Sequence, residues 1–268
     1  MIKIIFSDMD GTLLRSNNTL PEGFDAMIAE LKKRGVIFAP ASGRQYFALL
    51  ESFPQYENEF IFLGDNGTLV MRHGKELFSL PMKKDITLEM LHESASIKNI
   101  LRVYCGKKNA YIQDFQNTPR YYAVLRKYYT HTGIVKTWEE IDDVPIKVAF
   151  FDDNHNAEKT IYPKMQKFNG GEVQVLLSSD EWVDIMMPHV DKGFAVRKVQ
   201  EILNIKPEEC AAFGDYLNDY EMLKSVGYSF AMANAHPDLK KIAKFETASC
   251  DEGGVLVGIK KLMEMNLI

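Results

Sequence analysis

The chain of 268 residues is long enough for one large domain or two modest ones, and 46% of it is hydrophobic and 26% charged. A formal net charge of −5, with no block rich in lysine or arginine, argues against a nucleic-acid partner, because phosphate backbones are best met by a basic face. No apolar run approaches the roughly 20 residues that span a bilayer, and the apolar stretch in "MIKIIFSD" is too short for a secretory signal. Cys105, Cys210 and Cys250 are odd in number and far apart, which indicates reduced thiols and a cytoplasmic protein.

The first 81 residues alternate predicted strands and helices. Short apolar runs rich in β-formers predict strands that are buried on both faces. Phe24, Met27, Ile28 and Leu31 recur at the spacing of one helix face, and Gly35 stops that helix. In chain order the predicted elements are strand 3–8, helix 20–35, strand 36–43, helix 44–53, strand 60–67 and a hairpin-like excursion over 66–81.

The pattern changes after Pro81, where paired strands joined by short turns replace the alternation. The predicted elements here are helix 85–97, two strands within 100–115, helix 119–129, strand 146–153, helix 156–168 and two strands within 172–187. Hairpins imply an antiparallel sheet with helices on one face.

From Lys192 the alternation of strands and helices returns. The predicted elements are helix 193–203, strand 210–215, helix 218–226, strand 228–233, helix 237–243 and a final helix from Gly254. Such an alternation implies βαβ units on a parallel sheet. We therefore predict an α/β chain with a doubly wound core over residues 1–81 and 188–268 and an inserted α+β domain over residues 82–187.

Polar side chains follow the predicted strands of the core, and doubly wound sheets bind ligands at the carboxyl ends of their strands. The residues concerned are Asp8 and Asp10 after the first strand, Ser42, Gly43 and Arg44 after the second, Asp215 after a later one, and Lys192 at the start of the returning helix. Acids, a hydroxyl and a lysine at one edge of a sheet suit a metal-dependent phosphate-ester site.

The residue types explain this expectation. Asp8, Asp10 and Asp215 offer the hard oxygen ligands that Mg²⁺ prefers, and without a cation their like charges would repel one another. Lys192 supplies a compact positive charge for phosphate oxygens, and Ser42 supplies a neutral donor. A magnesium ion would also offset the charge between an anionic nucleophile and an anionic substrate.

Each signal also has a plainer structural interpretation. "DGT" is a common turn, and Ser42 with Gly43 would serve as a loop or a helix cap. Arg44 fits a phosphate contact and a surface salt bridge equally well, and Asn218 would cap the helix that it opens. The pairs Asp142–Asp143 and Asp152–Asp153 are expected to flank strands in solvent. The six histidines show no zinc-ligand spacing.

The four segments "DMDGT", "SGR", "DKG" and "GDYLND" resemble, in this order, the four motifs of the haloacid dehalogenase-like phosphatases. The layout is similar to that of the Cof-type subfamily, whose C2-type (IIB) cap is inserted between the second and third motifs. "GDNGT", "AMANA" and "DEGGV" resemble lesser landmarks of that subfamily. The resemblance implies a Rossmann-like core with a mobile cap that determines substrate specificity.

The resemblance also implies roles for individual residues. Asp8 would be the nucleophile that forms an aspartyl-phosphate, and Asp10 the general acid and base. Ser42, Gly43 and Lys192, with Arg44 and Asn218, would bind the phosphoryl group. Mg²⁺ would be bound by Asp8, the main-chain oxygen of Asp10 and Asp215, with Thr12 and Asp219 in supporting positions.

We therefore predict a Mg²⁺-dependent phosphatase of small phosphorylated metabolites. Sugar phosphates are the first expected substrates, followed by nucleotide and cofactor phosphates such as pyridoxal phosphate and FMN. A phosphomutase that uses the same core chemistry and a non-catalytic scaffold that binds phospho-ligands stay open as alternatives. The oligomeric state is left open, a monomer included.

Overall fold

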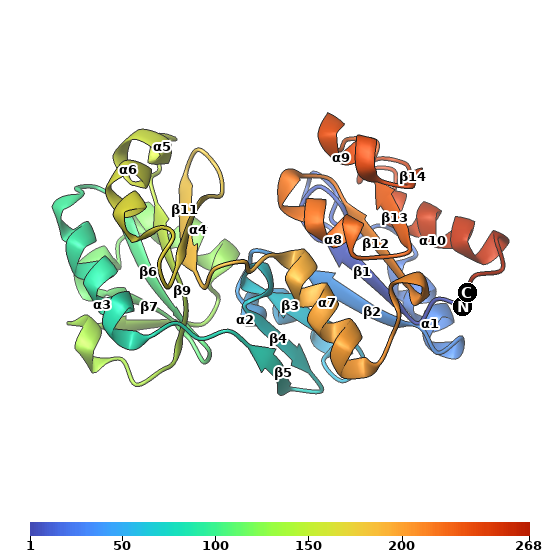
Figure 1. Cartoon of the computed structure of the whole chain (residues 1–268), viewed down its shortest axis with the longest axis horizontal. Coiled ribbons are helices and arrows are strands. Elements are labelled where there is room, and N and C mark those ends of the chain that lie inside the picture. The colour runs from blue at the N-terminus through green and yellow to red at the C-terminus, as the bar shows by residue number, and fades with distance from the viewer. The chain divides into compact units, whose positions relative to one another are not determined.

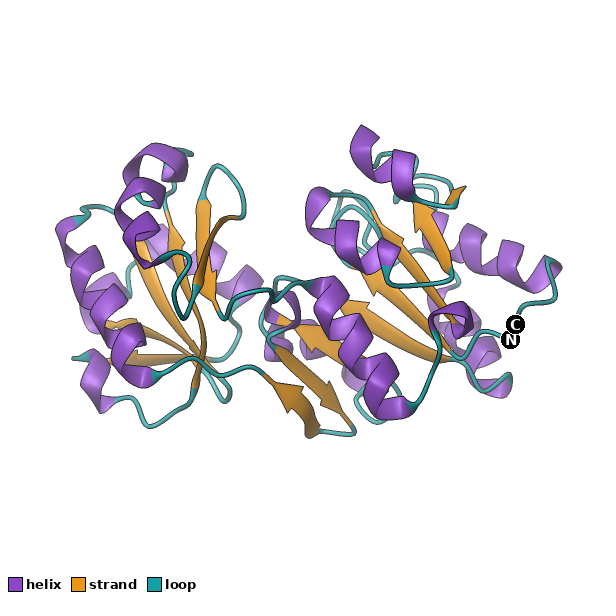
Figure 2. Cartoon of the chain, viewed as in Figure 1, coloured by secondary structure: helices purple, strands orange, loops and turns teal.

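The computed structural model describes residues 1–268 and divides the chain into two compact units, both built from a sheet flanked by helices (Figures 1 and 2). The first unit comprises Met1–Gly43, Phe53–Leu77 and Asp191–Ile268. The second comprises Arg44–Ser52 and Phe78–Val190. Residues 82–187, predicted as the insertion, lie within the second unit, and the predicted helix at 44–53 groups largely with that unit as well.

The first unit is built on an eight-stranded sheet with the order β14-β13-β12-β1-β2-β3-β4-β5. The strands are β1 (Ile4–Asp8), β2 (Ile37–Ala41), β3 (Ile61–Gly64), β4 (Leu69–Arg72), β5 (Lys75–Ser79), β12 (Cys210–Gly214), β13 (Tyr228–Ala231) and β14 (Phe245–Glu246). The pairs from β14 to β3 are parallel, and β4 returns antiparallel to β3. This confirms the predicted α/β fold class; the short strand β14 was not predicted.

The register of this sheet brings three strand ends to one level. Asp8 lies opposite Ala41 of β2, so Ser42 follows one residue beyond it. On the other side Ser7 lies opposite Phe213 of β12, so Asp215 also follows just past the strand end. Parallel pairing therefore gathers residues that lie far apart in the sequence at the same edge of the sheet.

The helices of the first unit all bury apolar side chains. Their bounds are α1 (Phe24–Lys33), α7 (Lys192–Leu203), α8 (Tyr220–Lys224), α9 (Pro237–Ile242) and α10 (Gly254–Glu264). The expected face of α1 is buried at Phe24, Met27, Ile28 and Leu31. α7 begins directly after Asp191, whose carboxylate accepts a hydrogen bond from the Phe194 N–H at 2.6 Å and so satisfies one free donor of the first turn.

The second unit contains a six-stranded sheet with the order β10-β11-β9-β6-β7-β8. Its strands are β6 (Leu101–Gly106), β7 (Ala110–Gln113), β8 (Thr132–Val135), β9 (Pro145–Phe151), β10 (Gln174–Leu177) and β11 (Trp182–Met186), and its helices are α2 (Tyr46–Glu51), α3 (Lys84–Glu93), α4 (Pro119–Tyr128), α5 (Ala157–Thr160) and α6 (Tyr162–Met165). The pairing is antiparallel as expected except between β7 and β8, which are parallel and joined through α4. β8 was not predicted, since "TGIV" is short and half exposed.

The two faces of this sheet differ. Alternate residues of β9 and β11, among them Val148, Phe150 and Ile185, join the apolar core made with α3, α5 and α6, which Figure 1 shows on one side of the sheet. The other face carries Phe151 and Trp182, whose rings lie 4.8 Å apart. Tyr128 of α4 packs edge-on against Trp182. At this end of α4 the aromatic side chain therefore serves packing.

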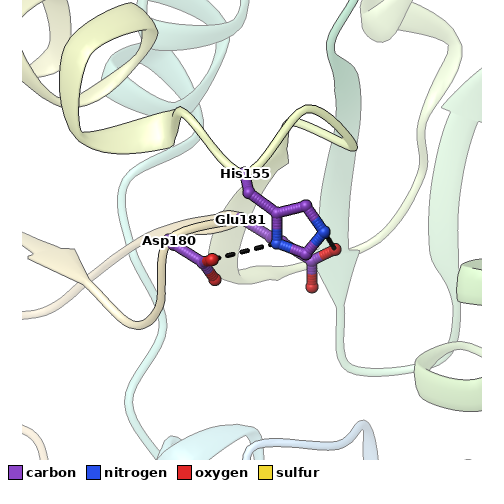
Figure 3. Close-up of side chains that lie close together, drawn as sticks. All are labelled: His155, Asp180 and Glu181. Carbon is purple, nitrogen blue, oxygen red and sulfur yellow. Dashed lines mark hydrogen bonds and ion pairs between the residues drawn. The ribbon is translucent and has the colours of Figure 1, made fainter.

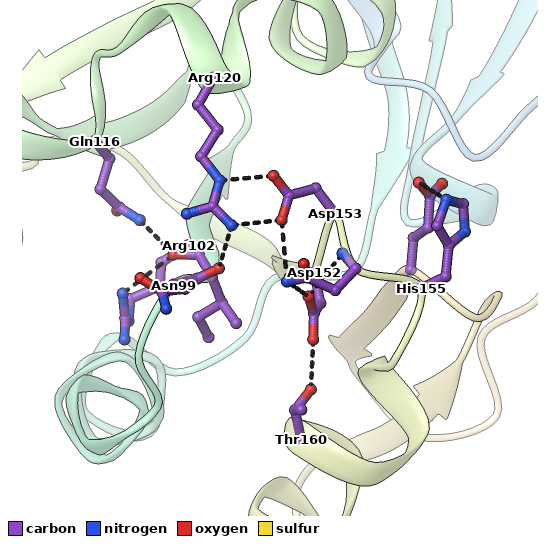
Figure 4. A network of polar contacts seen from close by, with 11 residues as sticks. Asn99, Arg102, Gln116, Arg120, Asp152, Asp153, His155 and Thr160 are labelled. Carbon is purple, nitrogen blue, oxygen red and sulfur yellow. Dashed lines mark hydrogen bonds and ion pairs between the residues drawn. The ribbon is translucent and has the colours of Figure 1, made fainter.

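Two local expectations for this unit are wrong. The predicted helix 156–168 is interrupted between α5 and α6, because Pro163 cannot continue the hydrogen-bond ladder of a helix interior. Asp143 and Asp152 are buried, not solvated. Asp152 accepts hydrogen bonds from Asn154 and Thr160 in a polar network (Figure 4), and Asp143 accepts from two backbone N–H groups of a turn. Hydrogen bonds of this kind to a carboxylate are invisible in a hydrophobicity pattern.

No helix of the chain combines the length and the apolar character that crossing a bilayer requires.

Candidate active site

The first component of the site is the turn that follows β1. β1 is buried throughout and ends at Asp8, whose side chain is also buried. Gly11 then adopts a left-handed conformation with φ +79°. A Cβ atom at this position would collide with the carboxylate of Asp215. Glycine is therefore required here both for the turn and for the close approach of the backbone to a charged group.

Lys192 is the centre of the site. It is the first residue of α7, and only 1% of it is exposed. Its Nζ donates to Asp8 Oδ1 at 2.5 Å and to Asp219 Oδ1 at 2.6 Å. A buried ammonium is tolerable when it is paired in this way, because the carboxylates replace its lost hydration. Lys192 thus holds together two acids that are 211 positions apart in the sequence.

Asp215 completes a group of three acids. Its Oδ1 accepts a hydrogen bond from Thr12 Oγ1 at 2.8 Å. Carboxylate oxygens of Asp8, Asp215 and Asp219 all lie within 4.8 Å of one another. Asp219 is fully buried, and its Oδ2 accepts from the backbone N–H groups of Asp215 and Tyr216. Asp219 therefore supports both Lys192 and the loop that presents Asp215.

The electrostatics of the group oppose full ionisation of its acids. Burial, followed by the neighbouring charge of Asp219, raises the pKa of Asp8 well above its usual range, although Lys192 acts in the opposite direction. Burial likewise raises the pKa of Asp215 to about 6, against the hydrogen bond from Thr12. Burial alone would lower the pKa of Lys192, but the charges of Asp219 and Asp8 outweigh it and raise that pKa. The cluster carries more negative charge than one lysine offsets.

The donor set fits a hard divalent cation. Both oxygens of Asp219 already accept hydrogen bonds from protein groups, whereas Asp8 and Asp215 carry the raised pKa values that a nearby cation would lower. Carboxylate oxygens are the ligands that Mg²⁺ prefers, with waters and phosphate oxygens completing an octahedron. Asp8 and Asp215 would hold such an ion, and Asp219 would support it through Lys192.

The remaining predicted residues are placed as follows. Ser42 is buried just after β2, and its N–H donates to the Leu63 carbonyl at 2.9 Å. Asp10 lies in the turn after β1 and forms an isolated bridge with Leu14. Arg44 is buried, but it groups with the second unit. Asn218 is exposed, and it is its neighbour Asp219 that contacts Lys192.

A family model described as haloacid dehalogenase-like hydrolase matches residues 5–259 of the chain. The chain belongs to this family. The predicted family and enzyme class, a phosphatase of the haloacid dehalogenase-like group, are thereby confirmed. Membership of this family shows that the chain is a hydrolase. The roles of individual residues stay predictions.

Known relatives of this haloacid dehalogenase-like hydrolase span nearly its whole length. The 5-amino-6-(5-phospho-D-ribitylamino)uracil phosphatase YbjI of Escherichia coli is 31% identical, over 98% of this chain and 97% of its own. The HMP-PP phosphatase of Cronobacter sakazakii is 26% identical, over 87% and 84%. The solved structure of SMU.1108c from Streptococcus mutans has a TM-score of 0.85 at 25% identity and covers 98% of this chain and 100% of its own.

The landmark segments outside the four motifs have structural functions in this hydrolase. In "AMANA", the Asn234 side chain donates to the Gly11 carbonyl at 2.8 Å and accepts from the Cys250 N–H. In "DEGGV", Asp251 accepts from the N–H and the hydroxyl of Ser16. Both segments therefore fasten the chain around the turn after β1. Their residue types alone did not reveal this, because the partners lie more than 220 positions away.

A second group of metal-ligand types lies in the other unit. Nδ1 of His155 lies 2.9 Å from Asp180 and its Nε2 lies 3.5 Å from Glu181 (Figure 3). The side chains of His155 and Asp180 are 61% and 65% exposed. Each ring nitrogen already faces a different carboxylate, so the arrangement is that of a surface ion-pair cluster and not of a closed ligand set.

Proposed function

We propose that the chain is a Mg²⁺-dependent phosphatase that hydrolyses small phosphate monoesters through an aspartyl-phosphate on Asp8. The observation that carries this proposal is the buried Lys192, which bonds to Asp8 and Asp219 beside Asp215. A nucleophile, a fixed cation and two further acids at one strand edge match what phosphoryl transfer requires, namely positioning and charge stabilisation.

In the first step an oxygen of Asp8 would attack phosphorus while the ester P–O bond breaks. Asp10 would give its proton to the leaving oxygen. Lys192, fixed by Asp219, would hold Asp8 in its charged form and then neutralise phosphoryl oxygens, together with the N–H and hydroxyl donors of Ser42 and the backbone of Gly43. A bound Mg²⁺ would supply further neutralisation of the negative charge that nucleophile and substrate share.

In the second step water would attack the phosphorus of the aspartyl-phosphate. Asp10 would take the proton of this water, the bond between phosphorus and Asp8 would break, and inorganic phosphate would leave. A hydroxyl of a second sugar in place of this water would make the enzyme a phosphomutase. Arg44 and Asn218 are proposed as further phosphate contacts, and Thr12 as the residue that orients Asp215.

For the substrate we propose esters of polyhydroxylated metabolites. Sugar phosphates are the first candidates, and the phosphoribityl compound in the name of the Escherichia coli relative joins a sugar-like chain to a heterocycle. Residues 82–187 are proposed to select among them. Lys147 and Asp184 are buried and lie 3.9 Å apart on the sheet face that α3, α5 and α6 do not cover. Burying two charges costs desolvation energy that apolar side chains would avoid, which supports a role of this face in substrate selection.

The test is phosphate release from a panel of monoesters, with Mg²⁺ and with EDTA, by the wild type and by Asp8→Asn. Release that requires both Mg²⁺ and Asp8 is expected, with a marked ranking among leaving groups. Equal turnover by Asp8→Asn would refute the mechanism. Phosphoryl transfer to a second sugar would indicate the mutase, and binding without turnover the scaffold. An absence of any ranking would contradict substrate selection by residues 82–187.

A further inference from the structure

The segment "GDNG" between β3 and β4 has an unusual backbone. Asp65, Asn66 and Gly67 follow one another with φ values of +51°, +56° and +95°. Left-handed backbone is costly for residues that carry a Cβ atom, and single residues in it are the rule. A run of three is retained only where the surrounding structure holds it in place, and such strain concentrates at functional sites.

One side of this segment contacts the loop of Ser42. The N–H of Asn66 donates to the Ser42 carbonyl at 2.9 Å, while the N–H of Ser42 donates to Leu63 at the end of β3. The Asn66 side chain lies along Gly43, where a Cβ atom would stand 3.2 Å from its Oδ1. β3 and the segment that follows it thus hold the Ser42 carbonyl, the Ser42 N–H and Gly43 in place.

The other side of the segment contacts the start of α7. A Cβ atom at Gly67 would lie 2.7 Å from the Ala195 Cβ and 2.9 Å from the Asp191 carbonyl oxygen. Asp191 caps α7, and Lys192 is the first residue of that helix. Any displacement of Gly67 therefore acts directly on the turn that carries the buried lysine.

We propose that Asp65–Gly67 is a positioning segment that sets the spacing between Ser42 and Lys192. Its left-handed backbone places the Ser42 loop on one side and the first turn of α7 on the other, so that both phosphoryl-binding groups stand at a fixed distance before substrate arrives. This rests on the proposed function in so far as Ser42 and Lys192 bind phosphate. Preorganisation of this kind matters because an error of about 1 Å in a reacting group costs about a hundredfold in rate.

The test uses the backbone as its variable. Gly67→Ala adds the clashing Cβ atom to a left-handed residue, and Gly35→Ala is the matched control. Gly35 lies in the same unit with φ +72° and has nothing within 4 Å of the added Cβ atom, so it introduces the same kind of strain without the contact. The probes are inorganic phosphate as a competitive inhibitor, kcat for a phosphate monoester, thermal unfolding and a crystal structure of Gly67→Ala.

We expect Gly67→Ala to weaken phosphate inhibition and to lower kcat by about tenfold to a hundredfold, with the bond from Lys192 to Asp8 lengthened in the crystal structure. Gly35→Ala should lose less stability, because its added Cβ atom meets nothing, and should keep its kinetic constants. Equal kinetic constants in the two variants, with the Lys192 bond unchanged, would overturn the proposal. If the wild type fails to hydrolyse any ester, the proposed function fails, while the crystal structure still decides whether Gly67 sets the position of Lys192.

Two variants of Asn66 distinguish the effect of the backbone conformation from the effect of the side chain. Asn66→Ala strains the left-handed position, whereas Asn66→Gly keeps that conformation accessible and removes the carboxamide. We expect Asn66→Gly to retain markedly more phosphate affinity than Asn66→Ala. Equal losses in the two variants would show that the carboxamide is what matters and would overturn the assignment to the backbone.

Discussion

The two clusters of metal-ligand side chains in this chain differ in what surrounds them, not in how close their atoms lie. Both Asp8–Asp215–Asp219 and His155–Asp180–Glu181 bring three ligand atoms within 4.8 Å. The first cluster is largely buried, and Lys192, 1% exposed, bonds to two of its acids. The second is mostly exposed, and its histidine already lies between two carboxylates. Proximity alone is therefore weak evidence for a site, whereas buried charge that the fold maintains is strong evidence.

The physical reason is desolvation. Water screens the second cluster, so its ion pairs contribute little to stability. The first cluster has lost that screening, which is why burial raises the pKa of both Asp8 and Asp215. A group that is held at a cost in the folded protein gains most from a cation or a substrate that relieves it.

The largest effect in this comparison is expected for Asp10, the proposed proton donor in the turn after β1. Asp10→Asn should lower kcat for sugar phosphates by about 10²- to 10⁴-fold, because a positioned general acid contributes that much. p-Nitrophenyl phosphate, whose leaving group needs no proton, should lose less in the first step. Asp238→Asn, an exposed acid that pairs with Lys241, is the control. Full activity in Asp10→Asn would contradict the proposed proton transfer by Asp10 and so weaken the case that the buried cluster is the catalytic one.

Asp215→Asn is expected to have a smaller effect, which concerns the free energy of unfolding and the binding of Mg²⁺. The pKa of Asp215 is raised in the folded protein to about 6, so between about pH 4 and pH 6 the folded state binds more protons than the unfolded state, and the unfolding free energy falls as pH rises. Without metal at neutral pH, Asp215→Asn should therefore be more stable than the wild type by about 1–3 kcal/mol. Excess Mg²⁺ should stabilise the wild type and not the variant.

Chemical denaturation with and without Mg²⁺, at several pH values, measures the unfolding free energies of the wild type and of Asp215→Asn. The control is Asp251→Asn, an exposed acid outside the cluster whose pKa is lowered by its bonds from Ser16. A variant that is less stable than the wild type at every pH, with an unchanged response to Mg²⁺, would show that Asp215 is a structural acid and not a metal ligand.

The smallest effect is expected at the second cluster. His155→Ala should change the free energy of unfolding by no more than about 0.5 kcal/mol, because it removes exposed ion pairs. Phosphate release and its Mg²⁺ dependence should match the wild type. Isothermal titration with Zn²⁺ checks for a hidden ligand set: tight binding that His155→Ala abolishes would give the two clusters equal standing as metal sites.

Much of the fold follows from local sequence. The buried runs at β1, β2 and β12 are short, apolar and bounded by turn residues, and the apolar face of α1 has helical spacing. Their types and approximate positions therefore follow from the sequence, although α1 begins at Phe24 and not at residue 20. β8 and β14 were missed because a strand of two to four half-exposed residues carries no period of its own. The interruption after α5 was missed because a helical period continues through Pro163.

For the site, the sequence predicted the candidate residues: an apolar strand that ends in Asp8 and Asp10, and the motifs that place Ser42, Lys192 and Asp215 near strand and helix ends. The contacts between these residues became visible only in the folded chain. It assigned Asp219, not Asn218, to the contact with Lys192, and it placed Asn66 and Gly67 between Ser42 and α7. Residue type is a local property, whereas burial, charge pairing and spacing depend on neighbours that only the folded chain brings together.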